Sequence, residues 1–218
     1  IFNLYNLITM MPDNVAIAPI LRDFATDLDI FTYNNLYFNE YSKFVTPHTR
    51  SRKFFNYFIH GKTSFLEGEI TNIGINIPVC SSHDQTLIEA EWLPGGLVIH
   101  NKKNLLTNLY FPFPGKAYAE DLIHSYILKK NGVKLYVTPV ASAYIEIFPG
   151  SSINTFTELK SFLIEKKREI DAKAYFLKIS KRNSTTFSLF AHILLFWNLL
   201  LLSFKKILKL SNYDFKKN

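Results

Sequence analysis

The chain has 218 residues, of which 48% are hydrophobic and 16% aromatic, so it can build a folded core and is not a disordered protein. Its single cysteine excludes a framework of internal disulfides. Residues 178–218 hold eight Lys or Arg and one acidic residue, which accounts for the whole net charge of +7. Residues 1–177 have no net charge, so the net positive charge is confined to the end of the chain. This distribution favours contact with an anionic membrane surface and argues against a nucleic-acid partner.

The first part of the chain predicts a helix, a tight turn and a buried strand. Apolar residues recur at helical spacing over residues 1–11, and a Pro-Asp-Asn turn follows. The run VAIAPIL at 15–21 is continuously apolar and of strand length, as in the buried strands of mostly parallel sheets. Arg22 and Asp23 follow it, where α/β sheets border ligand crevices, although a surface ion pair is the alternative. These elements predict an α/β fold.

Aromatic residues are dense over residues 24–77, in FTYNNLYFNEY and KFFNYFIHGK. Such rings can stack on the faces of sugars, or they can pack a small subdomain onto the sheet. The stretch GEITNIGINIPV at 68–79 alternates isoleucines with small or polar residues, which predicts a short strand or hairpin.

A tight turn with the sequence EWLPGG occupies residues 91–96, just before the predicted strand LVIH. Glycine has no Cβ, so Gly95 and Gly96 let the backbone approach a ligand closely. Trp92 could form a wall of the same pocket. A plain turn and a core tryptophan are the alternatives.

An acid pair, Glu120 and Asp121, begins a helix that Asn131 and Gly132 end. The free N–H groups of a helix start carry partial positive charge and keep a carboxylate ionised. An ionised carboxylate in a cleft can act as a general base, whereas acids at helix starts also serve simply to complement the helix dipole. Two strands, at 133–139 and 141–148, and an amphipathic helix at 154–171 are expected to follow.

The order and spacing of WLPGG, a Phe/Pro loop, AED and a helix ending KKNG resemble the acceptor half of a family 2 glycosyltransferase of the GT-A fold. The resemblance covers about residues 1–182 and implies an incomplete, Rossmann-like mixed sheet flanked by helices. In that family the second acid of the pair deprotonates the acceptor hydroxyl, which implies this role for Asp121. Asp23 would lie on the donor side. The residues implied on the acceptor side are Trp92, Gly95, Gly96 and Glu120.

The resemblance further implies a nucleotide-sugar donor, a glycan or lipid-linked acceptor, and inversion at the anomeric carbon. It also implies a divalent cation, Mg²⁺ or Mn²⁺. Asp27-Leu28-Asp29 matches the letters of the family's DxD motif but follows the strand too late, so no metal ligand is assigned in this chain. Because the chain begins with Ile1, we expect the nucleotide-binding part and most metal ligands to precede it.

Several positions depart from the family pattern, and the first is Ile123, where the family has an acid just past the pair. Ile127 stands where the family has an arginine one turn before the helix end, and Tyr144 lies where many members carry a histidine that completes the metal site. These departures permit a second hypothesis, a non-catalytic membrane-bound scaffold or pseudo-glycosyltransferase.

Residues 183–218 predict a separate apolar and basic tail. Within it, residues 187–204 carry no formal charge over eighteen residues, at the short end of a bilayer span. Basic residues on both flanks favour a helix in the membrane interface over a spanning one, whose downstream lysines would lie on the far side. A buried helix of a soluble domain is the third alternative. We therefore expect a C-terminal apolar helix that holds the catalytic domain at the membrane, facing the cytoplasm.

Overall fold

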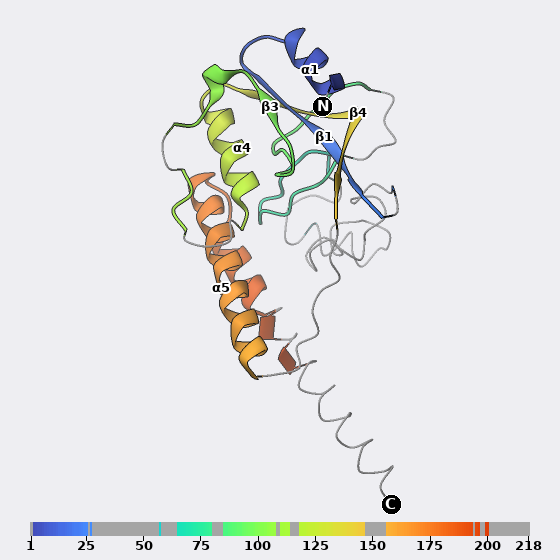
Figure 1. Cartoon of the computed structure of the whole chain (residues 1–218). Helices are drawn as coiled ribbons and strands as arrows, with labels where there is room; N and C mark the ends of the chain where they lie inside the picture. Colours follow the sequence, from blue (N-terminus) through green and yellow to red (C-terminus); the bar gives the residue numbers. More distant parts are fainter. Residues whose placement is uncertain are drawn as a thin grey trace, which may run out of the picture.

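The computed structural model describes residues 2–25, 27, 57, 65–79, 85–107, 110–113, 118–146, 156–193, 195–196 and 199–200. Over these residues the chain is a mixed α/β protein with one four-stranded mixed sheet (Figure 1), which confirms the predicted α/β class. In chain order the elements are α1 (Phe2–Thr9), β1 (Val15–Asp23), β2 (Ile88–Glu89), β3 (Ile99–His100), the 3-10 helix η2 (Lys102–Asn104), α4 (Glu120–Lys130), β4 (Lys134–Ile145) and α5 (Phe156–Ile179).

The centre of the sheet is the parallel pair β1 and β4. The strand order is β2-β4-β1-β3, with β2 antiparallel to β4 and β3 antiparallel to β1. Residues 15–21 of β1 are all buried, as expected for a strand covered on both faces. The continuous apolar run in the sequence therefore predicted this strand and its burial correctly.

The pairing of β1 with β4 shifts just after Pro19 and Thr138, where β4 carries three extra residues. Proline donates no N–H to a ladder, and one proline stands on each strand at this point, Pro19 and Pro139. The pairing then resumes as far as the end of β1. The two strands expected at 133–139 and 141–148 are therefore one strand. Its second half pairs with β1, whereas β2 pairs only with Tyr136 and Val137 of its first half.

Helices cover both faces of the sheet because β1 alternates its side chains between two apolar clusters. One cluster joins Val15 and Ile17 to Leu4 of α1. The other joins Ala16, Ala18 and Ile20 to Leu128 of α4.

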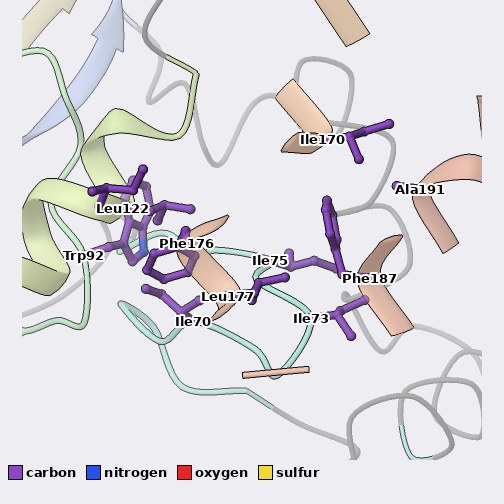
Figure 2. Packing of buried hydrophobic residues seen from close by; sticks show 11 residues of the cluster. Ile70, Ile73, Ile75, Trp92, Leu122, Ile170, Phe176, Leu177, Phe187 and Ala191 are labelled. Carbon is purple, nitrogen blue, oxygen red and sulfur yellow. The ribbon is translucent and has the colours of Figure 1, made fainter. Parts of the chain in front are cut away.

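A third cluster lies away from the sheet, between α4, α5, the 70–75 loop and the helix at 184–193 (Figure 2). That last helix begins after Asn183, whose Oδ1 accepts the N–H of Thr186 at 3.0 Å. Its residues Phe187 and Ala191 are buried in the cluster. The first part of the predicted tail thus packs against the body of the protein.

The continuous C-terminal apolar helix expected over residues 187–204 is not supported. The structure describes helical backbone at 184–193, 195–196 and 199–200, and the residues from 201 onward lie outside the described part. Within the described residues, no helix is both long and apolar enough to cross a membrane.

Candidate active site

The Pro-Gly-Gly turn lies between the start of α4 and the carboxyl end of the parallel strand pair. A Cβ built on Gly95 would lie 3.4 Å from the Cβ of Asp121. A Cβ on Gly96 would instead meet Leu21 of β1 at 3.2 Å and Ile145 of β4 at 3.8 Å. The turn therefore brings Asp121 to the sheet edge where open α/β sheets bind ligands.

Two hydrogen bonds fix this segment. The N–H of Leu93 donates to the hydroxyl of Ser125, in α4, at 2.9 Å, and both residues are buried. The indole Nε1 of Trp92 donates to the carbonyl of Ile77 at 3.0 Å. Trp92 is only 3% exposed and packs in the cluster of Figure 2, beside Leu122 and Phe176, so its position gives no support to an acceptor-binding wall.

Asp121 is partly buried in the first turn of α4, and its Oδ1 accepts the N–H of Leu122 at 2.9 Å. The preceding Ala119 is left-handed, with φ of 53°, and has no side chain that could cap the helix. The carboxylate of Asp121 therefore supplies an acceptor for a free helix N–H. Burial raises the pKa of Asp121 above its ordinary value, and the Leu122 N–H and the charge of Lys173 oppose this rise.

Lys173 of α5 faces the same acid from the core. It is 7% exposed, and burial lowers its pKa, while the negative charges of Glu169 and Asp121 act in the opposite direction. Its Nζ lies 5.9 Å from the ring centroid of Phe187. A cation from α5 thus helps to keep the carboxylate of Asp121 ionised.

Glu120 points into a second group of polar side chains. Its carboxylate accepts a hydrogen bond from the hydroxyl of Tyr110, and burial together with this bond raises the pKa of Tyr110 to about 12. The ring of Tyr110 lies 5.4 Å from that of His124, which lies 6.3 Å from His100. Burial lowers the pKa of His124, so its imidazole is neutral at pH 7. Glu120 is therefore hydrogen-bonded to Tyr110 and lies in a different group of polar side chains from Asp121.

Asp23, the predicted donor-side residue, ends β1 opposite Ile145. Because Ile145 also lies beside Gly96, Asp23 and the turn share one edge of the sheet. Its neighbour Arg22 makes an ion pair with Asp27 at 3.4 Å, and Asp27 also accepts the hydroxyl of Tyr144 at 2.8 Å.

The described residues do not by themselves fit the divalent cation that the resemblance implies. Asp27 is the one member of the Asp27-Leu28-Asp29 segment that the structure describes, and Arg22 and Tyr144 engage its carboxylate. Elsewhere in the described ranges, no group of three or more His, Cys, Asp or Glu is placed to hold a metal. Most of the aromatic stretch considered for sugar stacking also lies outside these ranges.

A cavity of about 380 Å³ lies at the C-terminal ends of α4 and α5. Glu91, Lys130 and Arg182 are among its lining residues, and Asp121 is not. Arg182 donates to Glu91 at 2.9 Å and to the carbonyl of Thr71 at 3.3 Å. This cavity is therefore distinct from the turn at Gly95.

Sequence reasoning missed three residues of the site, Tyr110, His124 and Lys173. The spacing of His124, four residues after Glu120, puts the two on one side of the helix and was a usable signal. Nothing local marks Tyr110 or Lys173, because each comes from another segment and meets α4 only through the fold.

No protein-family model, curated protein or solved structure matches this chain. Nothing in these comparisons identifies a GT-A glycosyltransferase, so the class of protein is a matter of proposal from the chain's own residues.

Proposed function

We propose that this chain forms the acceptor side of an inverting glycosyltransferase of the GT-A type. It would transfer a sugar from a nucleotide-sugar to a hydroxyl of a glycan or lipid-linked acceptor, with Asp121 as general base. The observation that carries the proposal is the close approach of Gly95 to Asp121, 3.4 Å between Cβ positions. Two motifs separated in sequence thereby meet at the edge of a parallel strand pair, where ligand sites form in such folds.

In the proposed reaction, Asp121 takes the proton of the acceptor hydroxyl. The oxygen then forms a bond to the anomeric carbon while the bond from that carbon to the leaving diphosphate breaks, and attack from the opposite face inverts the centre. A base works best when its pKa approaches the working pH. Burial moves the pKa of Asp121 upward, in that direction.

The proposal includes a membrane partner. Residues 183–218 would hold the protein at the membrane with the catalytic domain on the cytoplasmic side. The excess of positive charge from residue 178 onward supports contact with anionic lipids. A membrane location suits a lipid-linked or growing glycan acceptor.

One observation favours a second candidate, a non-catalytic scaffold. The buried ammonium of Lys173 acts on Asp121 from inside the protein, so the acid could serve as a structural partner between α4 and α5. Removing one member of a buried charge pair is strongly destabilising. Replacing an unpaired carboxylate whose pKa is raised by burial is not, because burial already disfavours its charged form. The two candidates therefore differ in what replacement of Asp121 does to stability.

The test is Asp121→Asn in the protein expressed from its native gene. Asparagine keeps an oxygen for the Leu122 N–H and removes a buried charge, so we expect an unchanged or higher unfolding temperature. Sugar transfer from a panel of nucleotide-sugars to membrane-extracted acceptors should fall roughly 10²- to 10⁴-fold, with donor binding retained. Asp171→Asn, at an exposed acid of α5, is the matched control and should leave transfer unchanged.

Wild-type transfer by the Asp121→Asn variant would exclude the base role. A wild-type protein that transfers none of the sugars, together with a variant that unfolds at lower temperature, would identify the scaffold instead.

A further inference from the structure

The helix at 184–193 has apolar residues on two opposite sides. On one side Phe187 and Ala191 are buried against the body. On the other side, and continuing to residue 196, Leu189, Ile193 and Phe196 are 65%, 55% and 64% exposed. Their spacing of four and three residues puts these three side chains on one helix face. We call them the exposed stripe.

The stripe cannot turn inward without breaking the packing that fixes the helix. The N–H of Asn183 donates to the carbonyl of Asn72 at 3.0 Å, and the N–H of Arg182 donates to Leu177 at 2.8 Å. Phe187 is 2% exposed in the cluster of Figure 2. Soluble monomers rarely expose a contiguous apolar patch unless it contacts a membrane or another protein.

The charges around the stripe indicate which of these surfaces it meets. Lys178 and Lys181 are exposed just before the helix, and Lys205, Lys206 and Lys209 follow it in the sequence. The acidic residue nearest after the helix is Asp214. A row of apolar side chains between basic flanks complements a bilayer with anionic headgroups.

We infer that the exposed stripe of Leu189, Ile193 and Phe196 inserts into the interface of an anionic lipid bilayer, with the helix parallel to the membrane plane. The opposite face stays packed on the protein, so the body rests directly on the lipid surface. This inference deepens the membrane association of the proposed function, and it does not depend on sugar transfer.

The experiment is co-sedimentation of the full chain with vesicles of phosphatidylcholine, with and without about one third phosphatidylglycerol. The test variant combines Leu189→Ser, Ile193→Ser and Phe196→Ser. The control variant combines Met10→Ser, Leu66→Ser and Leu105→Ser, three exposed apolar residues elsewhere. We expect the wild type and the control to bind the anionic vesicles, and the test variant to bind at least about tenfold more weakly, because its apolar area is lost.

Further outcomes separate the alternatives. Equal binding of the test variant and the wild type would overturn the inference, as would equal binding of the wild type to vesicles with and without phosphatidylglycerol. A wild-type dimer that the test variant dissociates, without a change in vesicle binding, would assign the stripe to a second copy of the chain and overturn it too. The loss of sugar transfer on Asp121→Asn is read separately, so failure of one proposal leaves the other standing.

Discussion

At the scale of single residues, Asp121 and Lys173 each affect the pKa of the other. Burial alone favours the neutral form of both groups, since it raises the pKa of the acid and lowers that of the lysine. Their opposite charges, with that of Glu169, counter this tendency. In the proposed reaction Lys173 is therefore a positioning residue, which acts on the acceptor proton only through Asp121.

The variant Lys173→Met keeps the apolar stem and removes the charge. Without the ammonium, the pKa of Asp121 should rise further, so the acid side of the pH profile for sugar transfer should move to higher pH. Lys178→Met, at an exposed lysine one turn later on α5, should leave the profile in place. An identical profile for wild type and Lys173→Met would show that the lysine does not act on the base.

The same variant changes how stability depends on pH. The folded-state pKa of Lys173 lies below its unfolded value of 10.5, so between these values the unfolded chain binds more protons. The free energy of unfolding of the wild type should therefore gain a contribution that increases as pH rises through this window. In Lys173→Met that contribution should be missing. Unfolding curves at a series of alkaline pH values measure how the free energy of unfolding of each protein depends on pH.

At the scale of elements, the end of α4 follows from one glycine. The N–H of Gly132 donates to Lys129 at 2.9 Å, and that of Val133 donates to Leu128 at 3.0 Å. Leu128 and Val133 also pack together in the cluster under the sheet. This is a Schellman ending, which requires the left-handed φ of 82° that Gly132 adopts. It turns the chain directly into β4.

Gly132→Ala should lower the free energy of unfolding by roughly 1–2 kcal/mol, the cost of an ordinary residue in the left-handed region. No atom lies within 4 Å of the added Cβ, so backbone conformation is the whole cause. Gly132→Asn should cost less, since asparagine tolerates this conformation. Chemical unfolding of the two variants measures the difference, and equal losses would contradict the explanation.

At the scale of the whole molecule, the sequence predicts those helices and strands that short local patterns of residues specify. The continuous apolar run at 15–21 identified the buried β1, and Asn131 with Gly132 identified the end of α4. The burial of Trp92 agrees with the core alternative for this residue. The effect of Lys173 on Asp121 could not be predicted, because it depends on contacts between distant segments. The continuity of β4 likewise depends on its pairing with β1, which resumes beyond the two prolines.

The boundary expected at residue 182 raises the question of how the following helix joins the body. Phe187→Ala should cost about 3–5 kcal/mol of unfolding free energy, as for a buried aromatic side chain. Leu189→Ala, two residues further on the same helix, should stay within about 0.5 kcal/mol because its side chain is exposed. Denaturant unfolding compares the pair, and a larger loss at Leu189 would mean that the helix packs by its other face.

The central strand pair also governs how the protein is made. In the register of β1 with β4, Val15 lies beside Lys134, so the ribosome emits more than a hundred residues between one partner and the other. Until β4 has been synthesised, β1 is an apolar segment without its strand partner. The entropic cost of closing this long loop must be met before the pairing stabilises the fold. The full pairing of β1 with β4 can therefore form only after translation has passed Ile145.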